Sequence, residues 1–168
     1  MDEKVKKPRT RAGFHYFPDY NHYTTSDLEK WLPELIEMGV SWLVLKAPKE
    51  RAIPETFITN LVKNGIEPIL QFNLPLTEPP NPSELASLLA AYAKWGIHAV
   101  QFFDQPNCQN SWKASQWAML DIVEQFLDRF IPYATLALKH GLVPVFPSPR
   151  PGGNYWDTAF LRSSLEAL

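Results

Sequence analysis

Amide and carboxylate side chains gather where two short apolar runs of the sequence end. The run GIHAVQFF is followed by Asp104, Gln105 and Asn107. The run GIEPILQFN ends with Gln71 and Asn73. Amides both donate and accept hydrogen bonds and carboxylates accept them, so these groups suit the hydroxyl groups of an uncharged polyhydroxylated ligand. We take them as candidate ligand contacts.

Polar and aromatic residues also follow the other apolar runs. Aromatic rings are able to cover the apolar C–H faces of a sugar. The further candidate substrate contacts are His15, Tyr16, Asp19, Lys46, Trp112 and Trp156. No Cys/His cluster has zinc-ligand spacing and no glycine-rich phosphate loop follows the first run, so no metal or organic cofactor is implied.

At several of these positions, a structural role within the protein is an alternative to contact with a ligand. Gln105 fits a polar loop residue, and Asp104 fits an acceptor that fixes a loop or caps a helix. His15 fits a hydrogen-bonded structural histidine, and Lys46 a side chain whose stem lies along apolar surface. Trp112 and Trp156 each fit either stacking on a ligand or packing within the protein.

A repeated unit positions these residues. Five glycines each precede a short apolar run: Gly13, Gly39, Gly65, Gly96 and Gly141. The runs are mostly apolar rather than alternating, which is typical of parallel strands covered on both faces. Four of the glycines end a helical pattern, where a positive φ is expected.

Start and stop signals predict the helices between the runs. Ser26 and Glu29 form a capping-box pattern. Asn81 is predicted to cap a third helix and Asp157 a last one. Pro132 is predicted to interrupt a long fourth helical region.

The order is five βα units, which predicts an α/β fold with a parallel sheet. An open doubly wound sheet fits this order, and so does a partial or shortened (β/α)8 TIM-type barrel of about five strands. A full barrel needs about 250 residues, so five of its eight units take about 156. We expect a basic flexible tail over residues 1–12 and a single domain over residues 13–168.

Composition excludes several classes of protein. Of the 168 residues, 45% are hydrophobic and 20% charged, as in a folded globular chain. The net charge of -2 disfavours a general nucleic-acid binder. No signal peptide or transmembrane segment is recognisable, so we expect a cytoplasmic protein without membrane contact. The single cysteine, Cys108, has no partner for an internal disulfide.

The strand-four run resembles that of the clan A glycoside hydrolases, over about residues 13–168. These are (β/α)8 barrels that hydrolyse sugars with retention. Their fourth strand ends in an Asn-Glu pair, often followed by Pro, and the Glu is the general acid/base. Here the run is Asp104-Gln105-Pro106, so the resemblance places Gln105 at the acid/base position.

The sequence departs from the pattern of that clan in two ways. Gln105 is an amide and is unable to transfer a proton to the glycosidic oxygen. The nucleophile of the clan lies on a seventh strand, beyond the five strands predicted here. Asp104 is the nearest carboxylate, but adjacent side chains of an extended strand point to opposite faces, so it does not simply replace Gln105. We therefore expect a truncated, split or inactive glycosidase relative that binds a saccharide.

The expected partners are a saccharide and either a further copy or a complementary C-terminal chain, because a five-stranded barrel segment leaves edges and an apolar face uncovered. An active retaining glycosidase is one alternative, using Asp104 with Asp19 or Asp157. A doubly wound module that binds a small molecule or a protein is another.

Overall fold

The computed structural model describes residues 11–168. The predicted tail, residues 1–12, lies outside that range except for its last two residues. The chain forms one five-stranded parallel sheet in the order β1-β2-β3-β4-β5. The strands are β1 Gly13–His15, β2 Trp42–Lys46, β3 Glu67–Gln71, β4 Ala99–Gln101 and β5 Val143–Pro144. The prediction of an α/β fold with five parallel strands is confirmed.

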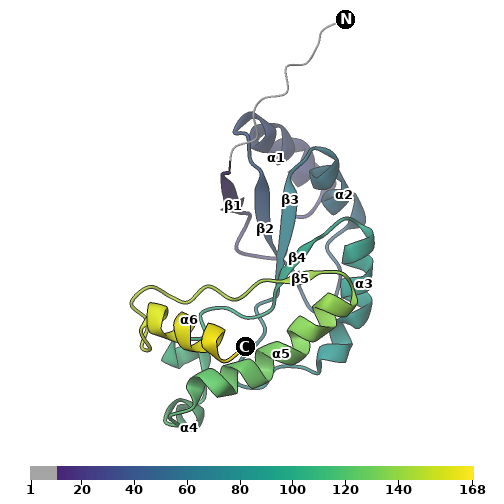
Figure 1. Cartoon of the computed structure of the whole chain (residues 1–168). Coiled ribbons are helices and arrows are strands. Elements are labelled where there is room, and N and C mark those ends of the chain that lie inside the picture. The colour runs from purple at the N-terminus through teal and green to yellow at the C-terminus, as the bar shows by residue number, and fades with distance from the viewer. Residues whose placement is uncertain (1–10) are drawn as a thin grey trace, which may run out of the picture.

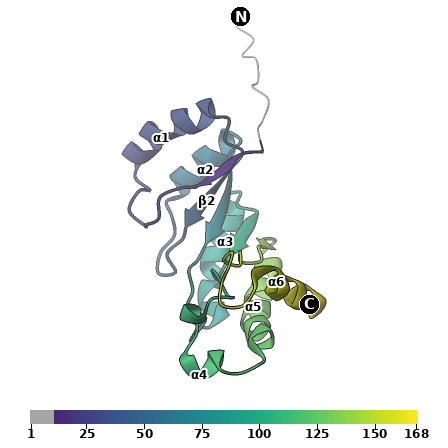
Figure 2. The same cartoon turned by 90° about the vertical axis from the view of Figure 1, so that its left-hand side faces the viewer.

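Helical segments separate each strand from the next, and a last helix follows β5. They are α1 Thr25–Glu37, α2 Glu55–Lys63, η1 Pro82–Leu85, α3 Ala86–Lys94, η2 Gln109–Ser111, α4 Ala114–Trp117, α5 Ile122–Lys139 and α6 Asp157–Glu166. Figures 1 and 2 show α1, α2, α3 and α5 following one another in the order of the strands, with α6 packed on α5.

The two faces of the sheet differ in how well they are covered. Side chains of one face are at most 1% exposed and pack against the helices: Leu43, Leu45, Leu70 and Val100. Their neighbours along the strands point the other way and are only half-buried or exposed: Trp42, Val44, Ile69, Ala99 and Val143. We call the first the helix-covered face and the second the open face.

Glycines end four of the helical segments with positive φ, as predicted. They are Gly39, Gly65, Gly96 and Gly141. At Gly96, with φ of +95°, a Cβ would also lie 3.2 Å from a methyl group of Val62. Only glycine therefore meets both the backbone and the packing requirement there.

The capping prediction for α1 is wrong by two residues. Thr24 is the N-cap, and its hydroxyl oxygen accepts from the Asp27 backbone N–H at 3.2 Å. The Asp27 carboxylate in turn accepts from the Thr24 backbone N–H at 3.0 Å, which closes the capping box. These hydrogen bonds lower the pKa of Asp27.

Two further helix predictions are also wrong. Pro132 lies inside α5, which continues through it from Ile122 to Lys139. The buried side chains of Phe126, Phe130 and Tyr133 hold both halves of α5 against the sheet, and this packing offsets the hydrogen bond that proline removes. Asp157 lies in the first turn of α6 rather than at its N-cap, which is Trp156.

The start predicted at Asn81 is confirmed. Its side-chain oxygen accepts from the Ser83 backbone N–H at 3.0 Å, and Glu84 reaches back to the Asn81 backbone N–H at 3.1 Å. The segment begins as the 3₁₀ turn η1 and continues into α3. Across residues 11–168, no helix combines the length and the hydropathy that a membrane crossing demands.

Candidate functional site

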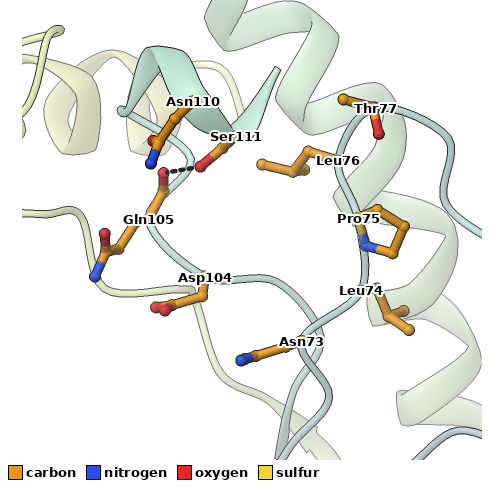
Figure 3. A pocket seen from close by; sticks show the side chains of 9 residues that line it. All are labelled: Asn73, Leu74, Pro75, Leu76, Thr77, Asp104, Gln105, Asn110 and Ser111. Carbon is orange, nitrogen blue, oxygen red and sulfur yellow. Dashed lines mark hydrogen bonds between the residues drawn. The ribbon is translucent and has the colours of Figure 1, made fainter. Parts of the chain in front are cut away.

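The loops after β3 and β4 enclose an open pocket of about 320 Å³. It lies at the carboxyl ends of the parallel strands, where α/β proteins bind their ligands. Its lining consists of Asn73, Leu74, Pro75, Leu76, Thr77, Asp104, Gln105, Asn110 and Ser111 (Figure 3). Three residues predicted from sequence, Asn73, Asp104 and Gln105, therefore meet in one pocket.

The loop after β4 has an unusual backbone at Gln105. Its φ is +45°, and within residues 11–168 no other non-glycine residue has a positive φ. The Gln105 carbonyl oxygen accepts from the Cys108 backbone N–H at 3.1 Å and from the Ser111 hydroxyl at 3.0 Å. These two hydrogen bonds hold a conformation that costs free energy for a side-chain-bearing residue.

This conformation overturns the expectation that Asp104 and Gln105 face opposite ways. That expectation assumed an extended strand, but β4 ends at Gln101, three residues earlier. Both side chains line the pocket and extend to the same side of the loop (Figure 3). Asp104 and Gln105 are therefore able to contact one ligand together.

The opposite wall of the pocket is held from α5 and α4. Arg129 donates from Nε to the Leu76 carbonyl oxygen at 2.8 Å, and its guanidinium lies 5.0 Å from the centre of the Trp112 ring. Gln116 donates to the Thr77 carbonyl oxygen at 3.3 Å. Arg129 lies within a helical pattern, and no sequence signal links it to a loop 53 residues earlier.

Asn107 has an internal role in the structure. It is fully buried, and its side-chain nitrogen donates to the carbonyl oxygens of Arg150 at 2.9 Å and Tyr155 at 3.0 Å. Its side-chain oxygen accepts from the Arg150 backbone N–H at 2.7 Å. A Cβ on Gly153 would lie 2.3 Å from the Asn107 amide nitrogen, so the 150–155 loop closes tightly on this side chain.

Trp112 is also engaged within the protein. It is 6% exposed, and its indole N–H donates to the Pro106 carbonyl oxygen at 2.7 Å. With Arg129 over its ring, the side chain packs under the β4 loop rather than at the surface. Trp156 differs, being 68% exposed at the start of α6, but it does not line the pocket.

The candidates after β1 lie outside the pocket. His15 is exposed on the open face, in register with Val44. Tyr16 packs against Tyr23 and Phe57, and burial raises the pKa of its phenol. Asp19 accepts from the Asn21 backbone N–H at 2.8 Å and lies 2.9 Å from His22 Nδ1, and these contacts lower the pKa of Asp19.

Several polar side chains at the strand ends are not engaged by the protein. Within residues 11–168, no side-chain hydrogen bond or ion pair is formed by Lys46, Gln71, Asn73 or Asp104. Gln71 is nevertheless only 6% exposed. Gln71 does not line the pocket, but Asn73 and Asp104 do, so their unengaged amide and carboxylate are available to a ligand there.

The catalytic capacity of the pocket is limited by its carboxyl groups. Asp104 supplies the one carboxyl group among the residues that line it, and neither Asp19 nor Asp157 does so. Glycoside hydrolysis by the usual routes needs two. Over residues 11–168, no three His, Cys, Asp or Glu side chains gather closely enough to hold a metal ion.

Comparison with known proteins identifies no family for this chain. No protein-family model matches the sequence, and no curated protein matches it. The resemblance to clan A glycoside hydrolases therefore stays a prediction, made from the residues quoted for it above.

Proposed function

We propose that this chain is a glycosidase-like barrel segment that binds a saccharide at the carboxyl ends of its strands. The observation that carries the proposal is the pocket between the β3 and β4 loops. Unengaged amide and carboxylate groups of Asn73 and Asp104 face it, beside the Gln105 amide and the hydroxyls of Thr77 and Ser111. Such a mixture of donors and acceptors suits vicinal sugar hydroxyls.

The strand order supports a barrel segment over a doubly wound sheet. A doubly wound sheet reverses its strand order part-way, which brings helices to both faces. Here the order is sequential throughout, and successive right-handed crossovers then place the helices on one face. Side chains of the helix-covered face are almost completely buried, whereas many on the open face are partly exposed. This difference agrees with helices on one face only.

The uncovered strand edges and the open face also support the proposal that a partner continues the barrel. β1 and β5 are edge strands, and the open face carries exposed apolar residues such as Val143. An apolar groove between β1 and α1 is lined by Phe14, Trp31, Leu35 and Met38. Further βα units, from a complementary chain or a second copy, would cover these surfaces.

We propose that this chain by itself binds a saccharide and does not hydrolyse it. Retaining glycosidases place two carboxyl groups about 5–5.5 Å apart across the scissile bond. Gln105 stands where the resemblance places the proton donor, and a carboxamide does not transfer that proton. Acid/base catalysis contributes a factor of about 10² to 10⁴ to such reactions.

A binding titration tests the proposal. A panel of neutral and acidic oligosaccharides is titrated into the full chain by calorimetry, with saturation-transfer NMR as a second readout. We expect Asp104→Ala to weaken binding about tenfold or more, since a lost hydrogen bond to a charged group costs about 1.5–3 kcal/mol. Asp128→Ala, at an exposed aspartate of α5, is the matched control. No binding by any saccharide would contradict the proposal.

Turnover is assayed separately on aryl glycosides. We expect none from this chain alone. Turnover that Asp104→Asn abolishes would instead support an active hydrolase in which Asp104 is one of the two carboxyl groups.

A further inference from the structure

Three polar residues end neighbouring strands side by side. Lys46 ends β2, Gln71 ends β3 and Gln101 ends β4. The strand register pairs Lys46 with Gln71 and Gln71 with Gln101. Because neighbouring strands lie about 4.8 Å apart, the row extends over roughly 10 Å.

The row lies on the open face of the sheet. The residues that precede it, Leu45, Leu70 and Val100, are 0% exposed on the helix-covered face. Successive side chains of a strand point to opposite faces, so the three polar side chains point away from the helices. Lys46 is half-buried there, whereas Gln71 and Gln101 are only 6% and 8% exposed, so a ligand reaches the row chiefly at Lys46.

Two members of the row lack partners. Gln71 is 6% exposed, and its carboxamide makes no hydrogen bond within residues 11–168. Lys46 is half-buried and forms no ion pair with any carboxylate of those residues. Gln101 is engaged, since its side-chain nitrogen donates to the Phe103 carbonyl oxygen at 2.8 Å. The row therefore offers one unpaired cation and one unengaged amide.

The row precedes the pocket along the chain, and none of its three residues lines the pocket itself. Asn73 follows Gln71 by two residues and Asp104 follows Gln101 by three, and both line the pocket. A cation thus ends β2, and a carboxylate follows β4 on the same edge of the sheet. An anionic group is attracted to Lys46 and repelled by Asp104, so this edge would orient a ligand that carries one.

We propose that the site takes an acidic saccharide, a sugar bearing a carboxylate. This inference rests on the proposed saccharide-binding function. The ligand carboxylate accepts charge-assisted hydrogen bonds from Lys46 Nζ, next to the Gln71 amide. The sugar hydroxyls extend towards Asn73, Asp104 and Gln105, and the Asp104 carboxylate accepts from them.

The test compares one sugar with and without its charge. An oligomer of a uronic acid and its fully methyl-esterified form are titrated into the full chain by calorimetry, at low and at physiological salt. We expect the free acid to bind about tenfold or more tightly than the ester, with a preference that shrinks as salt is added.

Variants assign that preference to Lys46. Lys46→Met is expected to bind acid and ester equally, and Lys46→Arg to retain the preference. Lys63→Met removes an exposed lysine at the other end of the sheet and is the matched control. Ester binding that persists in Lys46→Met shows that the variant is folded.

The two proposals fail in different ways. Equal binding of acid and ester by the unmodified chain, or a preference that survives in Lys46→Met, would overturn the acidic-saccharide inference and leave saccharide binding intact. No binding of either oligomer, nor of any neutral saccharide, would overturn both.

Discussion

At the scale of single residues, the β4 loop contains pocket-lining and buried structural residues side by side. Asp104 and Gln105 line the pocket, whereas Asn107, two residues later, is fully buried and bound to the 150–155 loop. Neighbouring polar residues of one short motif thus have separate roles. Burial and hydrogen-bond partners distinguish them. The Asn107 amide is held by backbone groups and positions the loop, whereas the Gln105 side-chain oxygen has only a 3.9 Å contact with Cys108 Sγ and the Asp104 carboxylate has no partner within residues 11–168.

The left-handed backbone of Gln105 predicts a stabilising substitution. Gln105→Gly removes the side chain that makes a φ of +45° costly, and we expect the free energy of unfolding to rise by about 0.5–1 kcal/mol. Gln105→Ala retains a Cβ and is the control, with no gain. Urea denaturation measures both. Equal stabilities of the two variants would show that the backbone is not strained there.

Asn107→Ala is expected to destabilise the fold by about 2–4 kcal/mol. It leaves the Arg150 N–H and the carbonyl groups of Arg150 and Tyr155 without their side-chain partner. Asn110→Ala, at an exposed asparagine of the same region, should change stability by less than about 0.5 kcal/mol. Thermal and urea unfolding compare them, and similar losses in both would argue against the anchoring role.

At the scale of elements, the helices are held by local caps and by long-range packing. The capping box of α1 uses Thr24 and Asp27, although Ser26 and Glu29 have the same spacing. Both pairs satisfy the sequence pattern, and only the direction in which the chain enters α1 selects one. In α5, packing of the buried face stabilises the helix on both sides of Pro132, so the helix continues without a break.

The observed cap predicts different effects for two similar substitutions. Thr24→Ala removes the acceptor of the Asp27 N–H and should cost about 1 kcal/mol in free energy of unfolding. Ser26→Ala, inside the first turn, should be neutral or slightly stabilising. Chemical denaturation of the two variants measures the difference, and a larger loss from Ser26→Ala would support the capping box expected from sequence.

At the scale of the whole molecule, the sheet is covered on one face only. Exposed apolar residues remain on the open face, on the outer side of β1 and along α6: Val143, Phe14, Trp156 and Leu165. Exposed apolar surface of this kind favours association. The carboxyl-end site and the open face belong to the same sheet, so a partner that covers this face would also border the site.

We expect the purified chain to self-associate in a concentration-dependent way. Val143→Lys places a charge on the open face at the β5 edge, where the side chain is 59% exposed, and should shift the chain towards monomer. Thr56→Lys, at an exposed position of α2, adds the same charge elsewhere and is the control for the change in charge. Sedimentation velocity over a dilution series measures this, and a dilution-stable monomer of the unmodified chain would contradict an open barrel segment.

Stability should also fall at alkaline pH. Burial raises the pKa of Tyr92 to about 12 and that of Tyr133 to about 12, above the ordinary value of 10.0. The unfolded chain then releases these protons at lower pH than the folded one, so stability is complete below pH 10 and is lost as pH rises towards 12.

Urea unfolding at a series of alkaline pH values, with tyrosinate absorbance in parallel, measures this loss. Tyr92→Phe removes one of the titrating groups and should flatten the decline. It also leaves the Ile53 backbone N–H, which donates to the Tyr92 hydroxyl at 2.8 Å, without its acceptor. An unchanged slope in Tyr92→Phe would contradict the contribution of that residue.

Much of the fold was predictable because its signals are local. Glycines before apolar runs marked where helices end and strands begin, and the resulting βα order required a parallel sheet. The sequence likewise placed Asn73, Asp104 and Gln105 at strand ends, which is where the pocket lies. These inferences need only backbone preferences and the order of elements.

Only the tertiary structure showed which polar side chains are engaged, because their partners lie far away along the chain. Whether an amide faces a ligand or the protein is set by groups far along the chain, as Asn107 with Arg150 and Arg129 with Leu76 show. The register that aligns Lys46, Gln71 and Gln101 is also a product of strand pairing. The amino-acid order by itself thus determined the elements and the polar groups at their ends, while folding selected which of those groups remain unengaged, because hydrogen bonding and burial depend on neighbours in space.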